Sequence, residues 1–328
     1  MKILVTGGAG FIGSHIVDSL VAKGHKVVVY DNFTSGQMEN LVNIKDDVEI
    51  IEGDILDYKR LEKAMKGVEV VSHQAAQLEI IRCIADPIED LKINTVGTLN
   101  VLKAAVKNGV QKLINASSAC VYGQAKTIPQ SEDHPTNPNW AYGVSKLAAE
   151  KYCQLFREIH PLSTISLRYS IVYGVREWCG RALTTFIKRV LEGNPPIIFG
   201  EGKQIRDFIY VSDVVGLHNV CLENDMAGNV VYNVSTRIGT NLKELAEMVI
   251  EVSGKELEPV YEDIKGGEYS SLMPFRIRLP AELKTMILSP KKAKKELNWI
   301  PRISLKSGIK MEWDWISSNP KRWLDFRI

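Results

Sequence analysis

The sequence predicts an α/β fold, a doubly wound parallel sheet with a smaller α/β lobe towards the carboxyl end of the chain. Three observations support this prediction. An apolar, strand-like run opens the chain and leads directly into a glycine-rich turn. Strand-like runs then alternate with helix-like segments, which is typical of a parallel sheet. After Gly174 the rhythm changes, because short strand-like runs mix with irregular segments that are rich in Gly and Pro.

The first strand-like run, residues 2–6, is followed by Gly7, Gly10 and Gly13. A strand, a tight glycine turn and a helix direct free backbone N–H groups and a positive dipole end at a pyrophosphate. The spacing GxxGxxG differs from the commoner GxGxxG, but a carboxylate, Asp31, closes the next strand-like run as a dinucleotide site requires. Asp31 would bind ribose hydroxyls and repel a 2′-phosphate, and the five residues after it include no Arg or Lys. The pattern predicts a Rossmann-type domain that binds NAD rather than NADP.

The remaining elements follow in chain order. Strand-like runs lie at residues 26–30, 48–52, 68–73, 112–116 and 163–168, and helix-like segments at 14–23, 88–108 and 141–160. We expect an NAD-binding Rossmann domain over residues 1–174, with returning segments near 205–240. Residues 175–328 are expected to form mainly a substrate-binding lobe that closes over the carboxyl ends of the strands, where open α/β sheets bind ligands.

The composition narrows the class of protein. With 328 residues, 45% of them apolar and 24% charged, the chain is expected to fold as a globular protein. The formal charge of +2 is spread without long runs, so nucleic acid is not an expected partner. Five cysteines show no metal-ligand spacing, which predicts no metal site and favours a reducing cytoplasm. Met1 leads directly into the first strand and no long apolar run follows, so neither a signal peptide nor a membrane span is expected.

A candidate acid/base centre lies in the middle of the chain. Tyr142 and Lys146 are four residues apart, hence on one face of the predicted helix. A lysine one turn away, with a positive nicotinamide, would lower the pKa of the tyrosine from about 10 towards neutrality, so that Tyr142 could take a proton from a substrate hydroxyl. The alternative is a surface Tyr and Lys on an amphipathic helix. Ser118 favours the catalytic interpretation, because it ends another strand-like run and can share the same hydroxyl.

Together these motifs resemble the nucleotide-sugar epimerase/dehydratase family of the extended short-chain dehydrogenases/reductases, in particular its UDP-glucose 4-epimerases. Residues 6–13, 53–55 and 73–77 match family segments, and Asn94, Ser118, Tyr142 and Lys146 match the active-site set. The resemblance implies a homodimer formed through the two long helices. It assigns to NAD the residues Gly7, Gly10, Phe11, Ile12, Gly13, Asp31, Asn32, Thr34, Ser35, Gly36, Asp54, Ile55, Gln74, Ala75, Ala76, Gln77, Asn94, Ala116, Tyr142, Lys146 and Tyr169.

The substrate site departs from the family pattern in two places. Ile171 stands where the family usually has an Asn that binds the diphosphate or the sugar, and Ile cannot make that hydrogen bond. The usual diphosphate Arg is absent just before Glu282, so Arg276 or Arg278 is expected to replace it. Arg206 is expected to clamp phosphate, since a guanidinium binds two phosphate oxygens at once. The resemblance assigns to the substrate the residues Ser118, Ser170, Ile171, Cys179, Arg206, Arg278 and Glu282.

The residues after Ser118 do not determine which reaction the protein catalyses. Family 4,6-dehydratases typically have Thr-Asp-Glu where this chain has Ser118-Ala119-Cys120, and the missing acid pair favours epimerisation at C4 of a UDP-hexose, UDP-hexosamine or UDP-hexuronic acid through a transient 4-keto sugar. Alternatively, Cys120 is an acid/base for 3- or 5-epimerisation or for dehydratase-type chemistry, with Cys179 as its partner. Both cysteines could instead only pack, with Cys179 lining the sugar pocket. A non-catalytic NAD-binding regulatory protein is the alternative from another class.

Overall fold

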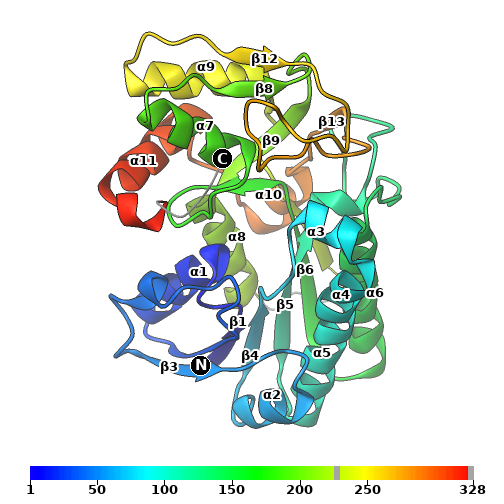
Figure 1. Ribbon diagram of the computed structural model, residues 1–328. Coiled ribbons are helices and arrows are strands. Elements are labelled where there is room, and N and C mark those ends of the chain that lie inside the picture. Colours follow the sequence, from blue (N-terminus) through cyan, green and yellow to red (C-terminus); the bar gives the residue numbers. More distant parts are fainter. Residues whose placement is uncertain (225–229, 324–328) are drawn as a thin grey trace.

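The computed structural model describes residues 1–224 and 230–323, and its largest element is a seven-stranded sheet with every pair parallel (Figure 1). The strand order is β10-β6-β5-β4-β1-β2-β3. The order reverses next to β1, which is the doubly wound arrangement, so the predicted fold class is confirmed. The strands are β1 (Lys2–Thr6), β2 (Lys26–Asp31), β3 (Val48–Glu52), β4 (Val70–His73), β5 (Lys112–Ser118), β6 (Ser163–Tyr169) and β10 (Val230–Val234).

The large sheet is buried on both faces, which explains the nearly continuous apolar runs of its strands. In β1, Ile3 and Val5 point into one core and Leu4 points into the other. Helices α1 (Phe11–Ala22) and α8 (Val211–Glu223) cover the first face, and α2 (Tyr58–Ala64), α5 (Gly97–Lys107) and α6 (Ala141–Ile159) cover the second (Figure 1).

The helix predicted over residues 88–108 is interrupted. The chain forms α3 (Ile80–Ala85), α4 (Pro87–Asp90), a π-helical segment η2 (Leu91–Val96) and then α5. The π segment widens one turn and shifts the side chains that follow, a feature common at functional sites. The other long helix, predicted over 141–160, is α6.

A smaller lobe is assembled from late segments. One sheet has the order β11-β9-β13 with β7 beside β9, and a second pairs β8 with β12. The segment 257–289, one of the irregular segments rich in Gly and Pro after Gly174, contributes the short strands β12 and β13. The strands of this lobe are β7 (Ile171–Tyr173), β8 (Ile197–Phe199), β9 (Ile205–Tyr210), β11 (Gly239–Asn241), β12 (Val260–Glu262) and β13 (Thr285–Met286), and its helices are α7 (Ala182–Leu191), α9 (Leu242–Ser253), α10 (Lys291–Leu297) and α11 (Leu305–Ser318). Three short 3-10 helices complete the described chain: η1 (Met38–Leu41) after β2, η3 (Ala119–Val121) after β5 and η4 (Pro320–Arg322) after α11.

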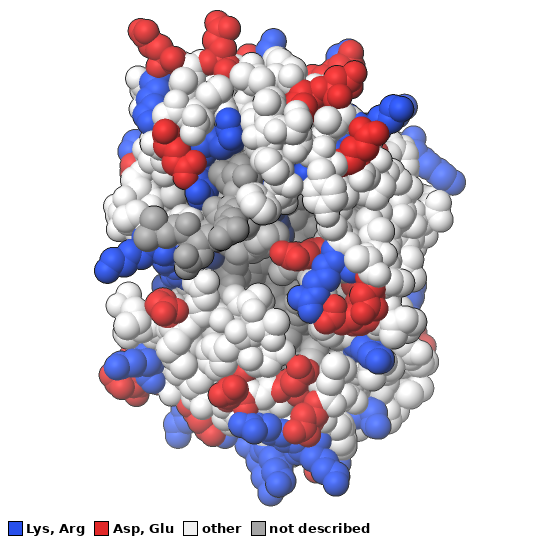
Figure 2. All heavy atoms as spheres, viewed as in Figure 1, with Lys and Arg blue, Asp and Glu red and all other residues white. Residues whose placement is uncertain are grey.

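One apolar cluster joins the two parts of the molecule. It includes Ile16 of α1, Leu183 of α7 and Ile309 of α11, all at most 2% exposed. The predicted domain limits, 1–174 with 205–240 and 175–328, stay a prediction, and residues 225–229 of the returning segment lie outside the described part of the chain. Acidic and basic side chains are interspersed over the face in Figure 2, as the small net charge suggests. In residues 1–224 and 230–323, no helix is long and apolar enough to cross a membrane, and no cluster of potential metal ligands occurs.

Candidate functional site

The glycine turn needs glycine at Gly7 and Gly13, because a side chain at either position would collide with the backbone. Gly7 adopts a left-handed φ of +66°, and a Cβ there would lie 2.7 Å from the backbone nitrogen of Ala75. A Cβ on Gly13 would lie 2.0 Å from the carbonyl oxygen of Gly7. Gly10 caps the N-terminus of α1, whose free N–H groups therefore face the turn. This cradle fits a pyrophosphate, which needs close approach to the backbone.

Asp31 is held beside this cradle at the end of β2. Its carboxylate accepts hydrogen bonds from the backbone N–H groups of Ala9 and Phe33, both at 2.9 Å. Burial raises the pKa of Asp31, and these N–H donors lower it. A carboxylate has about four acceptor sites, so each oxygen keeps room for a ribose hydroxyl. The residues present therefore fit the adenosine ribose of NAD.

The other residues predicted to bind NAD follow the carboxyl ends of neighbouring strands. Asn32 donates to the carboxylate of Asp54 at 2.9 Å, which joins the loops after β2 and β3. The hydroxyl of Tyr169 donates to Gln74 at 3.2 Å, which joins the ends of β6 and β4. Along the same edge lie Phe11 and Ile12 in the first turn of α1, Thr34, Ser35 and Gly36 after β2, Ile55 after β3, Ala75, Ala76 and Gln77 after β4, and Ala116 within β5.

Asn94 lies in the π-helical segment and connects three elements. Its amide nitrogen is within hydrogen-bond distance of the Gln77 carbonyl at 2.9 Å, of Asp90 at 2.8 Å and of the Ser145 hydroxyl at 3.1 Å. Its amide oxygen accepts from the backbone N–H of Gln77 at 2.9 Å. Asn94 thereby fixes the loop after β4 against α6, the helix that carries Tyr142 and Lys146.

Tyr142 and Ser118 meet at the end of β5. Ser118 is the last residue of that strand, its oxygen accepts from the backbone N–H of Cys120 at 3.1 Å, and its hydroxyl is close enough to the Tyr142 phenol to lower the pKa of the phenol. Burial raises the pKa of Tyr142, whereas Ser118 and the positive charge of Arg181 lower it. The arrangement gives a phenol and a hydroxyl that can share one substrate oxygen.

Lys146 is deeply buried one helical turn after Tyr142. It is only 2% exposed, and burial lowers its own pKa to about 8. In the protein without a cofactor, burial raises the pKa of Tyr142 and Arg181 is the cation that opposes this effect. Desolvation penalises both the phenolate and the ammonium. That Lys146, together with a bound nicotinamide, brings the pKa of Tyr142 towards neutrality stays a prediction.

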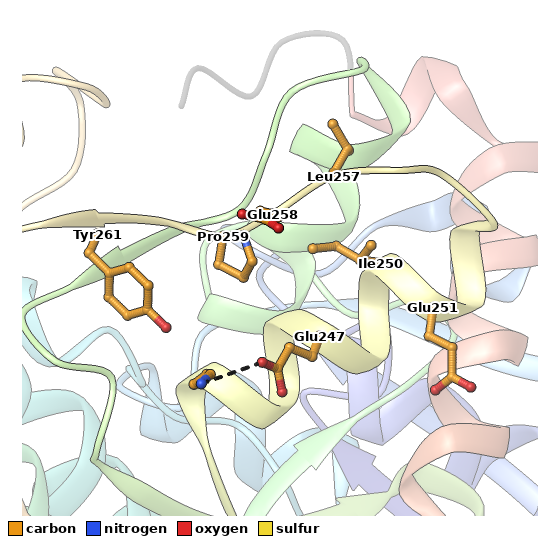
Figure 3. A pocket seen from close by; sticks show the side chains of 8 residues that line it. Glu247, Ile250, Glu251, Leu257, Glu258, Pro259 and Tyr261 are labelled. Carbon is orange, nitrogen blue, oxygen red and sulfur yellow. Dashed lines mark ion pairs between the residues drawn. The ribbon is translucent and has the colours of Figure 1, made fainter.

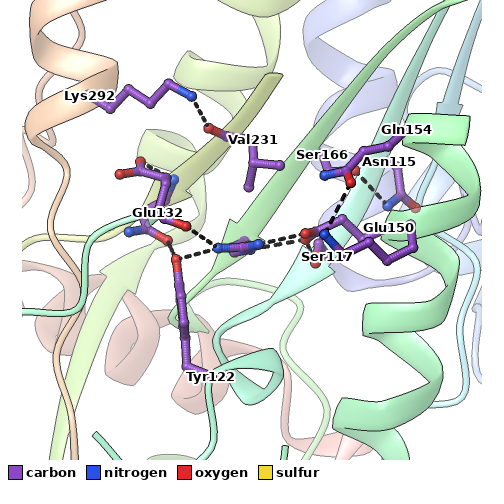
Figure 4. A network of polar contacts seen from close by, with 12 residues as sticks. Asn115, Ser117, Tyr122, Glu132, Glu150, Gln154, Ser166, Val231 and Lys292 are labelled. Atoms are coloured by element: carbon purple, nitrogen blue, oxygen red, sulfur yellow. Dashed lines mark hydrogen bonds and ion pairs between the residues drawn. The ribbon is translucent and has the colours of Figure 1, made fainter. Parts of the chain in front are cut away.

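A buried ion pair fixes α6 to the sheet directly behind Ser118. The guanidinium of Arg168 on β6 donates to both carboxylate oxygens of Glu150 on α6, at 2.6 and 3.0 Å, and the Ser117 hydroxyl donates to the same carboxylate at 2.8 Å. Arg168 also donates to the Tyr122 phenol at 2.7 Å, which in turn donates to Asn233 on β10. Figure 4 shows this network between the strands and the helix. It sets the position of the helix from which Tyr142 and Lys146 project.

Three of the predicted substrate residues form one charged cluster in the smaller lobe. Glu282 lies 3.8 Å from the Arg206 guanidinium and 3.6 Å from that of Arg278, and it accepts from the Gln204 amide at 2.8 Å. Arg278 also donates to the Ile264 carbonyl, and Arg276 donates to the Gly180 carbonyl instead. Two guanidinium groups share one carboxylate, so the cluster keeps positive charge for an anionic ligand.

Cys120, the alternative acid/base, and Cys179, a predicted substrate residue, lie in different surroundings. Cys120 is partly exposed and close to Tyr142; burial raises the pKa of its thiol, while Ser118, Arg206 and Arg181 lower it. Cys179 is buried in the core, and burial raises its pKa to about 12, which favours packing over acid/base work.

Ser170 and Ile171 lie where the chain passes from β6 to β7. The Ser170 hydroxyl is buried and has no hydrogen-bond partner among the described residues, and Ile171 packs against two apolar clusters.

Sequence reasoning missed Arg181, the residue whose charge acts on both Tyr142 and Cys120. It precedes α7, and its guanidinium donates to the Val172 carbonyl at 2.8 Å. No signal in the sequence distinguishes Arg181 from a surface arginine at a helix start.

A surface groove of about 460 Å³ lies elsewhere, between α9 and the segment that leads to β12 (Figure 3). Glu247, Ile250 and Tyr261 are among its lining residues. It contains none of the residues predicted to bind NAD or substrate, and its carboxylates make it a poor place for a diphosphate.

Comparison with known proteins agrees with this geometry. The model of the NAD dependent epimerase/dehydratase family matches residues 3–235. The putative UDP-glucose 4-epimerase of Methanocaldococcus jannaschii is 39% identical over 97% of this chain and 99% of its own. The UDP-glucose 4-epimerase of Thermotoga maritima, solved with UDP-glucose, superposes with a TM-score of 0.89 at 34% identity, covering 98% of this chain and all of that one. That of Thermus thermophilus, solved with NAD, gives 0.86 at 33%, covering 97% and 99%. The predicted resemblance is confirmed, and the chain belongs to the NAD-dependent epimerase/dehydratase family.

Proposed function

We propose that the protein inverts C4 of a UDP-sugar through a transient 4-keto sugar. The protein is an NAD-dependent nucleotide-sugar epimerase; the proposal concerns the nucleotide, the residues and their roles. The observation that carries it is the proximity of Tyr142 and Ser118 at the strand edge that also holds the dinucleotide cradle. The relatives solved with UDP-glucose and with NAD support the same assignment.

Each step needs a proton to be moved at the C4 oxygen. When bound, NAD supplies hydride acceptance and return at C4. Tyr142 takes the proton of the C4 hydroxyl and later gives it back, while Ser118 holds the same oxygen by a hydrogen bond. The pKa of Lys146, lowered to about 8, still leaves the ammonium largely charged at neutral pH, so it can bind the ribose next to the nicotinamide.

The nucleotide end is assigned to the arginine cluster. Arg206 and Arg278 would bind the diphosphate, because guanidinium groups match pairs of phosphate oxygens. Glu282 already accepts from Gln204 and lies beside both arginines, so we propose that it orients them as well as meeting the nucleotide ribose.

A second candidate function uses Cys120. Its thiol is partly exposed beside Tyr142, and burial keeps the thiol protonated by raising its pKa. A protonated thiol in that place could deliver a proton to a carbon next to the keto group, which is the chemistry of a 3- or 5-epimerase. Solvent deuterium separates the two functions, because C4 inversion puts none into carbon and 3- or 5-epimerisation must.

The experiment is to incubate the protein with UDP-glucose, UDP-N-acetylglucosamine and UDP-glucuronic acid, and to separate the C4 epimers. We expect interconversion of at least one pair, no carbon-bound deuterium, and a loss of roughly 10²–10⁴-fold in kcat for Tyr142→Phe. Tyr152→Phe, a partly exposed position on the same helix, is the matched control and should keep the activity. Absence of any interconversion refutes the proposal, and full activity of Tyr142→Phe refutes the role of the residue.

We also propose a homodimer. Apolar side chains are exposed on the two long helical runs, α4–η2–α5 and α6, including Ile88 at 59%, Val144 at 53% and Ile159 at 60%, and the two runs contact each other. Joined with the same face of a second copy, they would form a four-helix bundle. Light scattering should give twice the chain mass, and Val144→Lys should give the monomer; a wild-type monomer would refute this. A cytoplasmic location is proposed because the five cysteines are all free thiols.

A further inference from the structure

Two buried carboxyl groups of the smaller lobe, one just after β7 and one on the C-terminal helix α11, lie within reach of each other. Glu177 follows β7 and Glu312 lies on α11, and they are 2% and 0% exposed. With both ionised, none of their four oxygens accepts a well-aligned hydrogen bond among the described residues, and the nearest cation, Arg181, lies 3.4 Å from Glu177. Burial raises the pKa of both groups, and the negative charge of Glu177 raises the pKa of Glu312 further. One proton between the two carboxyls supplies the missing hydrogen bond and removes one of the two charges.

Among the titratable groups around this pair, one is a cation that can balance its negative charge. Tyr173 on β7 donates to the backbone carbonyls of Ser304 and Leu305. Tyr210 on β9 is close enough for Glu312 to raise its pKa. Asp213 on α8 influences Tyr173, but its own carboxylate accepts from the backbone N–H groups of residues 302 and 303. Among the groups that act on the pair, only Arg181 is positive.

Arg181 connects this pair to the acid/base centre. Its guanidinium lies 3.4 Å from Glu177 and donates to the Val172 carbonyl at 2.8 Å. Val172 comes shortly after Tyr169, which is the register partner of Ser118 on the neighbouring strand. The side chain of Arg181 is 34% exposed, so its contact with Glu177 does not bury it completely. Its positive charge reaches both Tyr142 and Cys120.

We propose that Glu177 and Glu312 share one proton and anchor the Arg181 guanidinium at the start of α7, so that Arg181 is the cation that tunes the acid/base groups of this site. The proposal rests on the proposed function for its catalytic meaning. Arg181, Glu177 and Glu312 are positioning residues, because they act through Tyr142. A helix at the end of the chain thereby influences the proton transfer at the carboxyl ends of the strands.

The shared proton is tested without substrate. A buried acid with a raised pKa stabilises the native state at low pH, and this contribution is lost as the pH rises through its native pKa. The thermal unfolding midpoint of the wild type should therefore fall between about pH 5 and 8 more steeply than that of Glu312→Gln, whose carboxamide donates a hydrogen bond at every pH. Asp314→Asn, exposed on the same helix, is the control and should keep the wild-type slope. Equal slopes for wild type and Glu312→Gln overturn the shared proton.

The position of Arg181 is tested by alkylation of Cys120, the partly exposed one of the five cysteines, with iodoacetamide at fixed pH. Only the thiolate reacts, so Arg181→Gln should slow the reaction about three- to tenfold, while Arg181→Lys keeps most of the rate. The double variant Glu177→Gln/Glu312→Gln distinguishes two effects of the pair, anchoring of Arg181 and a direct effect of its negative charge on Cys120. If Arg181 stays in place, removing negative charge speeds alkylation; if the pair anchors Arg181, alkylation slows. A faster reaction, or an unchanged rate in Arg181→Gln, overturns the proposal.

Catalysis provides the last readout. In the active enzyme, Arg181→Gln should raise the apparent pKa that Tyr142 contributes to the pH profile of kcat. At pH values below this pKa, kcat should fall about tenfold for each unit by which the pKa rises. An equal loss of kcat in Arg181→Gln and Arg181→Lys, with this pKa unchanged, would mean a structural role and would overturn the tuning. Failure of the proposed function is distinguishable, because the unfolding and alkylation results do not depend on any turnover.

Discussion

Breaking the ion pair of Arg168 and Glu150 should destabilise the protein more than the loss of any surface ion pair. The two side chains are 4% and 0% exposed. Arg168→Met leaves the Glu150 carboxylate with the Ser117 hydroxyl as its remaining donor, at 2.8 Å. Removal of one partner of a buried pair typically costs about 3–5 kcal/mol, because the other charge stays desolvated. We therefore expect the free energy of unfolding, measured with urea, to fall by about that amount.

Two further variants separate the charge effect from lost packing. In Glu150→Leu/Arg168→Met no buried charge remains, so the double variant should be more stable than Arg168→Met by about 2 kcal/mol, although Ser117 loses its acceptor. Lys306→Ala removes an exposed pair with Glu251, in which both side chains are about 60% exposed, and should change stability by less than about 0.5 kcal/mol. A loss below about 1 kcal/mol for Arg168→Met, or a double variant as unstable as the sum of its two single variants, would refute the reasoning.

The remaining predictions concern the dinucleotide site. Gly13→Ala should abolish NAD binding in a calorimetric titration, because its Cβ would lie 2.0 Å from the Gly7 carbonyl oxygen, whereas Gly216→Ala on α8 should bind normally, its Cβ meeting nothing closer than 3.5 Å. Asp31→Ser should reduce the preference for NAD over NADP by at least about tenfold in the same titration, since the charge that repels a 2′-phosphate is lost; an unchanged preference would contradict its role. Burial lowers the pKa of His73 to about 3, so its contribution to stability is complete above about pH 6.5 and is lost as the pH falls towards 3, and His73→Gln should show a flatter loss of unfolding midpoint in acid.

The sequence predicted what depends on local order along the chain. Alternating strand-like and helix-like runs are enough for a parallel sheet, and the position of Asp31 relative to Gly13 is enough for a dinucleotide cradle, because both are fixed within one βαβ unit. The π-helical turn at Asn94 was not predictable. One widened turn leaves the apolar spacing of a long helix nearly unchanged, although it decides which side chains meet Gln77 and Ser145.

Contacts between segments that are far apart in the sequence could not be predicted either. Glu177 and Glu312 are ordinary acidic residues in the sequence, and only the packing of α11 beside β9 and α7 brings one to the other. The same holds for Arg168 and Glu150, whose pairing depends on how α6 lies across β6. The influence of Arg181 on the pKa of Tyr142 was equally unpredictable, because nothing in the sequence links these two distant residues. Burial raises the pKa of Tyr142 and lowers that of Lys146, which the spacing of the two residues along a helix could not show.

The charges around Tyr142 explain why both parts of the chain are needed for one proton transfer. Ser118 ends β5, Cys120 lies in the turn after it and Tyr142 lies on α6. Burial raises the pKa of both the phenol and the thiol. The positive charges that oppose this effect, Arg181 and Arg206, come from the smaller lobe. The sheet therefore supplies groups that hold their protons, and the lobe supplies the charge that makes those protons easier to remove. Because one apolar cluster joins the two parts, any change that shifts the lobe against the sheet should alter the proton transfer before it alters the binding of the dinucleotide.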